Sequence, residues 1–281
     1  MEWTIAESAV ISKTPIRDSE DRLVLTEGNN SIQFAAVVDG ATDKSGRDYG
    51  GVSGGALAAD IVADVLRAPA PDTSPFTTVT RITAALAKVR RHHNIGESDP
   101  LAPNAVAAVF IPDRHEVWRV GDVHFAVHSD SGWHEYPAEK KIDRVVAGIR
   151  AAYLHCLLAR GVPAADLVAS DPGRAMVLPV LREQGRLANL PGPYGYGLLN
   201  GTDVPPRFVE VIPLDSTADE VVLATDGYLS PAPTLADAEA ALAASLAEDP
   251  LRINEYPATK GILPGASTFD DRTYLRLVRK R

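Results

Sequence analysis

Apolar residues in this chain occur in short runs bounded by turn residues, which is the pattern of β-strands that contribute to a folded core. Seven such runs predict strands over residues 32–38, 105–111, 117–120, 125–127, 208–212, 221–224 and 273–278. The predicted strand content is therefore substantial.

Apolar residues spaced three and four positions apart predict helices between these strands. This spacing covers residues 57–66, 79–89 and 142–157. A fourth helix is expected over 235–247, because the hydroxyl of Thr234 can cap its first turn. The whole stretch 140–190 is predicted as two helices. The segment 187–206 is rich in Gly, Pro and Asn and is predicted as a long surface loop.

The order of these elements argues against a doubly wound parallel sheet. Two helices follow the first long strand in succession and a meander of strands comes next, so strands and helices do not alternate strictly. A mixed or antiparallel α+β architecture fits better. The length of 281 residues permits one or two domains, and we favour one domain spanning residues 1–281.

Composition indicates an ordinary globular protein, with 45% apolar and 23% charged residues, which is enough to build a sizeable core. The N-terminal residues carry acid and precede no basic stretch or long apolar run, so neither a secretory signal nor a membrane span is predicted. The single cysteine, Cys156, excludes an internal disulfide and a cysteine-based zinc site. We expect a cytoplasmic protein in which Cys156 is a buried packing residue.

The net charge is −9, from 37 acidic and 28 basic residues. This excess repels a phosphate backbone over most of the surface and argues against nucleic-acid binding. The same excess suits cation binding, which makes the positions of the acids more informative than their number.

Three predicted strands end in an Asp beside a Gly, at Asp39-Gly40, Gly121-Asp122 and Asp226-Gly227. Asp-Gly is also a common turn dipeptide, so each pair alone is better explained as a hairpin turn. Two further acidic pairs, Glu20-Asp21 and Asp270-Asp271, flank the first and last predicted strands.

Agreement among five such motifs favours a metal site over five separate turns. If the strand ends converge, their carboxylates repel one another unless cations neutralise them. Oxygen ligands without thiolates select hard cations such as Mg²⁺ or Mn²⁺. The histidines near the central strands, His124, His128 and His134, are expected to be surface or satisfied core side chains.

The order and context of these motifs resemble the metal-dependent type-2C (PPM-type) serine/threonine protein phosphatases, with this chain as a divergent, bacterial-type member. The resemblance spans residues 16–279. The matching segments are Ser19-Glu20-Asp21, Val38-Asp39-Gly40, Gly121-Asp122, Leu223-Ala224-Thr225-Asp226-Gly227 and Ser267-Thr268-Phe269-Asp270-Asp271-Arg272-Thr273.

The resemblance implies a four-layer α-β-β-α sandwich of two antiparallel sheets flanked by helices, with a helical elaboration at about residues 140–190. It implies a centre of two Mn²⁺ or Mg²⁺ ions at one edge, with Asp39 bridging them. The Gly40 carbonyl and Glu20 would serve one ion, and Asp226 and Asp270 the other. Asp122 matches an acid near a weaker third ion, whereas Asp21 and Asp271 are expected to be structural.

The chemistry implied is hydrolysis of a phosphate ester. Two cations about 4 Å apart can lower the pKa of a shared water and clamp the phosphoryl oxygens, so no protein nucleophile is needed. The sequence agrees, because it has no P-loop and no cysteine followed by a phosphate-cradling loop. Arg17 lies close to the family's phosphate-binding arginine, although its spacing to Glu20 is one residue short. Lys13 is the substitute, and a solvated surface arginine is the alternative.

Other departures concern catalysis more than fold. Ala41 stands where many eukaryotic members have a histidine that acts as general acid, and Asn104 and Val123 replace small residues of the pattern. The leading hypothesis is a protein phosphatase, a metal-dependent hydrolase of phosphoserine and phosphothreonine. The alternatives are a catalytically weak phosphatase-like module that binds a phosphorylated partner, and a phosphatase of a small metabolite.

Overall fold

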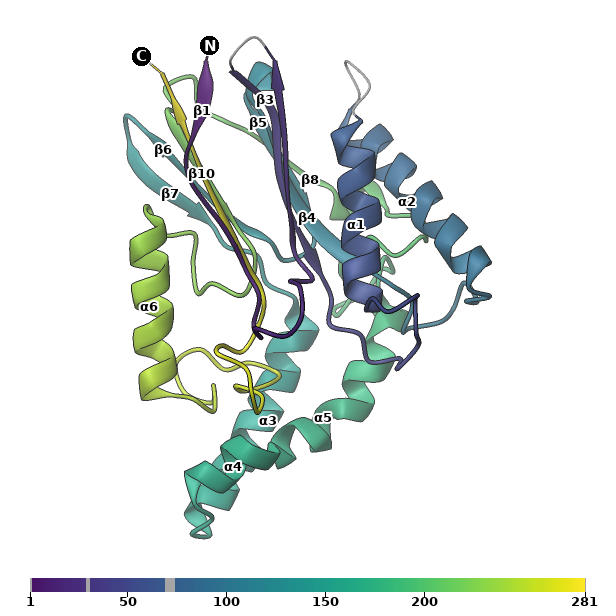
Figure 1. Cartoon of the computed structure of the whole chain (residues 1–281), viewed down its shortest axis with the longest axis vertical. Coiled ribbons are helices and arrows are strands. Elements are labelled where there is room, and N and C mark those ends of the chain that lie inside the picture. Colours follow the sequence, from purple (N-terminus) through teal and green to yellow (C-terminus); the bar gives the residue numbers. More distant parts are fainter. Residues whose placement is uncertain (1, 29–30, 69–73, 281) are drawn as a thin grey trace.

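Two five-stranded antiparallel sheets form the centre of the protein (Figure 1). The computed structural model describes residues 2–28, 31–68 and 74–280. One sheet has the order β1 (Trp3–Ile11), β10 (Arg272–Arg279), β9 (Glu220–Ala224), β6 (His124–Ser129) and β7 (Gly132–Tyr136). The other has the order β2 (Arg22–Gly28), β3 (Ser31–Gly40), β4 (Ala105–Ile111), β5 (Glu116–Val120) and β8 (Glu210–Pro213).

The inner faces of the two sheets pack on each other through one apolar core. Trp3 of β1 meets Phe110 of β4 edge to face, with ring centroids 4.8 Å apart, and Phe125 of β6 is fully buried in the same cluster. Buried aromatic side chains contribute much of the apolar area that stabilises such a core.

Helices cover both outer faces of the sandwich (Figure 1). The helix α6 (Leu235–Glu248) lies on the sheet that contains β10, and α1 (Gly54–Arg67) and α2 (Pro75–His92) lie on the sheet that contains β3. Side-chain hydroxyls start these helices: Ser53 caps α1, Ser74 caps α2, and Thr234 caps α6 as predicted. The predicted α-β-β-α sandwich is confirmed.

A set of three helices lies beneath the lower ends of both sheets in Figure 1, where two were predicted. These are α3 (Lys141–Ala159), α4 (Ala164–Ser170) and α5 (Pro172–Glu183). Asp171 separates α4 from α5 because its backbone turns left-handed, at φ 36°, while its side chain caps α5. Apolar residues of α3 and α5, including Val146 and Leu181, close the end of the core between the sheets.

The strands that sequence patterning missed, β1, β2 and β7, all lie at sheet edges. Edge strands are partly exposed, so their polar and apolar residues mix and the apolar run disappears. The edge strand β8 begins at Glu210 and not at 208, because a 3₁₀ turn occupies Pro206–Phe208.

The prediction that Cys156 is buried is wrong. Cys156 is exposed on α3, whereas its neighbours Leu154 and Leu157 face the core. Apolar neighbours in sequence do not determine the face of a helix on which a residue lies, because each step turns it by about 100°. No helix in the described part of the chain is long and apolar enough to cross a membrane.

Candidate functional site

The fold brings the predicted acidic motifs from both sheets to one cleft, at the end of the sandwich that faces α3 and α5. Strand β3 ends in Asp39-Gly40, β9 leads into Asp226, and β10 starts after Asp270. Asp122 follows β5. All of these residues line a single cavity of about 140 Å³. Pockets that enclose a drug-sized molecule are larger, at roughly 300–1,000 Å³, so this cavity suits a small group such as a phosphoryl group.

Glycine is required at Gly40 by close backbone packing. A Cβ at this position would lie 2.4 Å from the carbonyl oxygen of Gly55 and 2.6 Å from that of Glu20. The chain that carries Asp39 thereby contacts both the start of α1 and the segment that carries Glu20. The Asp-Gly pair therefore serves the assembly of the cleft and not a hairpin turn.

Asp39 and Asp226 lie side by side without a cationic partner. They share a hydrogen bond, and neither makes a salt bridge to any described residue. Burial and repulsion from Asp226 and Asp21 raise the pKa of Asp39. Desolvation in the cleft, followed by repulsion from Asp270 and Asp122, raises the pKa of Asp226 to about 7. The Asp226 side chain is nevertheless open to the cleft.

Glu20, Asp270 and Asp271, in contrast, already form salt bridges with two lysines. Lys13 Nζ lies 2.9 Å from Glu20 Oε2, 3.0 Å from Asp271 Oδ2 and 3.3 Å from Asp270 Oδ1. Lys260 Nζ lies 2.7 Å from Asp270 Oδ2. Burial disfavours the charged form of Asp270, but the two ammonium groups outweigh it and lower the pKa of this carboxyl.

The Asp39–Asp226 pair and the carboxylates bound to lysines differ in how well they fit a divalent cation. The Asp39–Asp226 pair offers paired carboxylate oxygens that form no salt bridge, which fits Mg²⁺ or Mn²⁺. The described acids of the cleft do not bring oxygens from three residues within 4.8 Å of one another. Because Lys13 and Lys260 hold the remaining carboxylates, the residues fit one cation better than two.

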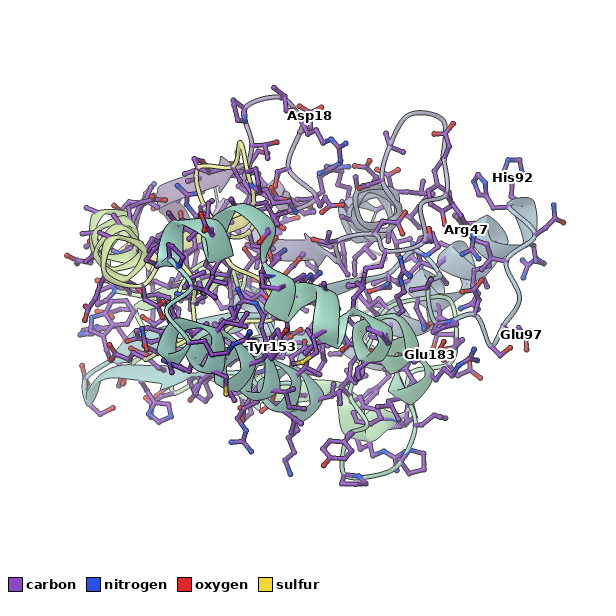
Figure 2. All side chains as sticks on the ribbon, turned by 90° about the horizontal axis from the view of Figure 1, so that it is seen from below. Asp18, Arg47, His92, Glu97, Tyr153 and Glu183 are labelled. Carbon is purple, nitrogen blue, oxygen red and sulfur yellow. The ribbon has the colours of Figure 1, made fainter. Side chains whose placement is uncertain are left out.

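The other predicted residues occupy different environments. Arg17 is exposed and does not line the cavity; its neighbour Asp18 lies on a loop that projects from the edge of the molecule in Figure 2. Glu20 is buried and accepts a hydrogen bond from the Ser53 hydroxyl. Asp21 accepts a hydrogen bond of 2.8 Å from the Thr225 hydroxyl, and Asp271 accepts bonds from two backbone N–H groups.

Sequence patterning missed a basic wall on the same cavity, formed by Lys44, Lys140, Arg174 and Lys260. These residues come from the loop after β3, the start of α3, the first turn of α5 and the loop before β10. No spacing in the sequence relates these four positions. Lys140 is paired, with Nζ 2.7 Å from Asp143 and 3.7 Å from Asp122.

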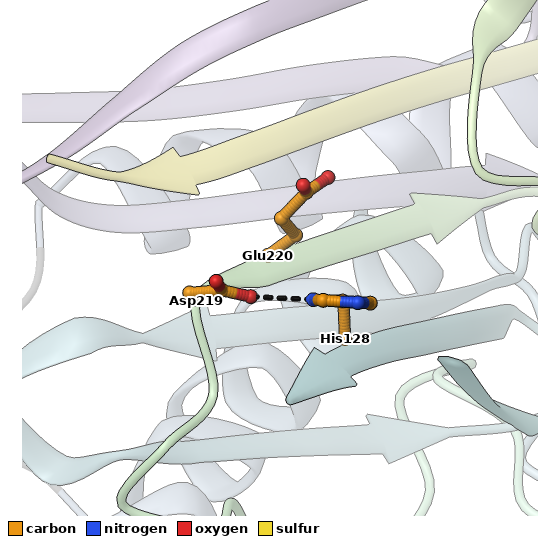
Figure 3. A group of neighbouring side chains, drawn as sticks. All are labelled: His128, Asp219 and Glu220. Carbon is orange, nitrogen blue, oxygen red and sulfur yellow. Dashed lines mark hydrogen bonds and ion pairs between the residues drawn. The ribbon is translucent and has the colours of Figure 1, made fainter. Parts of the chain in front are cut away.

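A second group of potential ligands lies at the opposite end of β9 from Asp226. His128, Asp219 and Glu220 each offer an atom within 4.8 Å of the others (Figure 3). His128 Nδ1 lies 2.6 Å from Asp219, while Glu220 points away from this pair and accepts a bond of 2.8 Å from Arg276. These three residues are better explained as part of a network of ion pairs between neighbouring strands.

No protein-family model and no curated protein matches the chain. Among solved structures, a serine/threonine phosphatase of Mycobacterium tuberculosis, PstP/Ppp, aligns over 100% of both chains with a TM-score of 0.51 and 15% identity. The serine/threonine phosphatase Stp1 of Staphylococcus aureus aligns over 100% of this chain and 98% of the Stp1 chain, with a TM-score of 0.49 and 14% identity. The catalytic domain of PstP in complex with two manganese ions aligns over 99% of both chains, also with a TM-score of 0.49 and 14% identity. The first alignment shows that the chain has the fold of this phosphatase.

The pKa of Asp226 predicts how the stability of the metal-free protein depends on pH. The folded pKa of about 7 exceeds the ordinary value of 3.8, so between these values the folded chain holds the proton more tightly than the unfolded chain. Stability from this group therefore falls as the pH rises toward 7. We expect chelator-treated protein to melt at a higher temperature at pH 6 than at pH 8, with Mn²⁺ restoring stability at pH 8.

Thermal unfolding at both pH values, with and without Mn²⁺, measures this effect. Asp226→Asn is the matched control, because it removes the titrating group and should shrink the difference. A melting temperature that responds to pH equally in both proteins would contradict the assignment to Asp226.

Proposed function

We propose that this chain is a metal-dependent phosphohydrolase that removes phosphate from phosphoserine and phosphothreonine residues of proteins. The observation that carries the proposal is the Asp39–Asp226 pair, which forms no salt bridge and lies with a basic wall in a cavity of about 140 Å³. A cavity of this size admits a phosphoryl group, and an adjoining pocket of about 430 Å³ that shares Asp226 and Asp270 has room for the part of the substrate that carries it. The shared phosphatase fold supports the same activity.

The roles of the residues follow from their placement. Asp39 and Asp226 would hold a divalent cation, with the Gly40 carbonyl beside them and Asp122 contributing negative charge. When bound, the cation supplies activation of a water and neutralisation of the phosphoryl oxygens. Cationic side chains of the wall would orient the phosphate from the other side. Lys13 and Lys260 would offset two of the three negative charges of Glu20, Asp270 and Asp271 without a second ion.

Hydrolysis assays test this function. Purified protein is given p-nitrophenyl phosphate, a phosphothreonine peptide or a small phosphorylated metabolite, each with Mn²⁺, with Mg²⁺ or with chelator. We expect turnover with either metal, none with chelator, and preference for the peptide. Preference for the metabolite would redirect the proposal to small substrates.

A second candidate function is a phosphatase-like module that binds a phosphorylated partner without turning it over. The ion pairs of Lys13 and Lys260 favour it, because they occupy carboxylates that a two-metal enzyme would need. Ala41 also offers no proton for a leaving group. Binding of the phosphopeptide by a folded protein, with no turnover under any metal, would support this candidate.

Metal stoichiometry provides a separate prediction. We expect one equivalent of tightly bound Mn²⁺ per chain, measured from the electron paramagnetic resonance of free Mn²⁺ during titration. Lys260→Met should allow a second equivalent to bind, because Asp270 loses the ammonium that lies 2.7 Å away. Lys141→Met, at an exposed lysine outside the cavity, is the control. Two tight equivalents in the unmodified protein would contradict the prediction.

A further inference from the structure

Two cations of the basic wall have no acidic partner. Lys44 Nζ donates only to the backbone carbonyl of Thr42, at 3.2 Å. Arg174 Nη1 donates to the Thr259 carbonyl at 2.9 Å and to its hydroxyl at 3.1 Å. Throughout the described part of the chain, no carboxylate oxygen lies within 4.0 Å of either side chain.

The neighbouring lysines make this arrangement unusual. Lys13, Lys140 and Lys260 all form ion pairs in or beside the cleft, so acids are available there. In a chain with net charge −9, two side chains left unpaired are not explained by a shortage of acids. Burial is the main factor that lowers the pKa of both side chains, although acids beyond salt-bridge distance partly offset it, so keeping the two cations in the cleft costs stability.

The environment of Lys44 agrees with this interpretation. Burial, followed by the positive charges of Arg174, Lys140 and Lys260, lowers the pKa of Lys44 to about 8. The Lys44 ammonium therefore lies in a positive region of the cleft from which much of the water is excluded. A bound anion would offset both the burial and the repulsion.

The two side chains are held by separate parts of the fold. Lys44 lies on the loop after β3, whose last residues include Asp39, and its neighbour Asp43 lines the same cavity without forming a salt bridge with it. Arg174 lies in the first turn of α5, where its backbone N–H donates to the Asp171 carboxylate at 2.8 Å. Only Nη1 of its guanidinium takes part in hydrogen bonds within the described chain, which leaves Nη2 and Nε available to a ligand.

We propose that Lys44 and Arg174 form an anion subsite that binds the tetrahedral phosphate group of the substrate, in the cavity that the Asp39–Asp226 pair also lines. The identity of the anion rests on the proposed function. A planar guanidinium and a point ammonium suit a phosphate monoester or the free phosphate product. The subsite takes the role that spacing alone assigned to Arg17.

Inorganic phosphate is the probe that tests this subsite. Isothermal titration calorimetry of the full chain with phosphate, with Mn²⁺ and with chelator, measures the dissociation constant. We expect Lys44→Met and Arg174→Met each to weaken phosphate binding by roughly ten- to a hundredfold, the range for losing a hydrogen bond to a charged group. Arg182→Met, at an exposed arginine of α5, is the matched control and should bind phosphate as the unmodified protein does.

Stability gives a second readout. Because Lys44 is an enclosed cation without an acidic partner, Lys44→Met should melt at the same or a higher temperature in the absence of phosphate. Phosphate should then stabilise the unmodified protein but not this variant. If Lys44→Met is folded but is not stabilised by phosphate, this result confirms that Lys44 binds the anion.

The outcomes separate this subsite from the proposed function. Phosphate binding that depends on Lys44 and Arg174, without any turnover, would support the subsite and contradict the proposed phosphohydrolase activity. Turnover with unchanged phosphate affinity in both variants would overturn the subsite alone. So would an Arg17→Met variant that loses phosphate binding while the other two retain it, or an unmodified protein that binds no phosphate at millimolar concentration.

Discussion

Asp39→Asn is expected to abolish metal-dependent phosphate release while making the metal-free protein more stable. Asparagine has nearly the same shape but no negative charge, so the pair with Asp226 loses its attraction for a cation. Metal-derived stabilisation of the transition state is worth several kcal/mol, and about 4 kcal/mol corresponds to a rate loss of about a thousandfold. The same change removes a carboxylate whose pKa is raised by burial and by repulsion from Asp226, so the metal-free protein no longer bears the cost of charging it.

The two effects have opposite signs, which distinguishes loss of the site from loss of the fold. Phosphate release is measured with Mn²⁺, and thermal unfolding is measured with chelator at pH 8. Asp130→Asn, at an exposed acid on the turn between β6 and β7, is the control and should change neither result. Retained turnover in Asp39→Asn would remove Asp39 from the proposed centre. Lost turnover with a lower melting temperature would indicate damage to the fold.

Arg150→Met is expected to produce the largest loss of stability. The Arg150 side chain is fully buried, and its Nη2 donates to Asp171 at 2.9 Å. Its Nη1 donates to the carbonyls of Leu251 at 2.9 Å and Ala258 at 3.1 Å. Removing one partner of a buried pair leaves a charge without compensation, which costs about 3–5 kcal/mol. Urea denaturation followed by circular dichroism measures this loss.

The Arg150–Asp171 pair also holds in place two segments that line the cleft. Asp171 caps α5 immediately before Arg174, and Arg150 ties this cap to the loop that carries Thr259 and Lys260. We therefore expect Arg150→Met to weaken phosphate binding as well. Asp171→Asn combined with Arg150→Met should cost less than the sum of the single changes, because the two groups are coupled. Arg160→Met, at the exposed end of α3, is the control. A loss below about 1 kcal/mol, the level of an exposed pair, would contradict this role.

Local patterning determined most of the architecture. Strands β3, β4 and β9 are central and buried on both faces, so they appear as uninterrupted apolar runs in the sequence. The cap at Thr234 and the amphipathic spacing of α1 and α2 were readable for the same reason, because each depends on residues within a few positions of one another. Edge strands lacked this signal.

The sequence by itself determined which acids stand at strand ends, and the family resemblance implied that Asp39, Asp122, Asp226 and Asp270 would share an edge of the sandwich, as they do. Only the tertiary structure decided the charge balance among them. Lys13 and Lys260 form salt bridges with one set of carboxylates, and Lys44 and Arg174 form none with any described residue. Coulomb interactions depend on distance in space, and these lysines and arginines reach the cleft from segments whose separation along the chain carries no periodic signal.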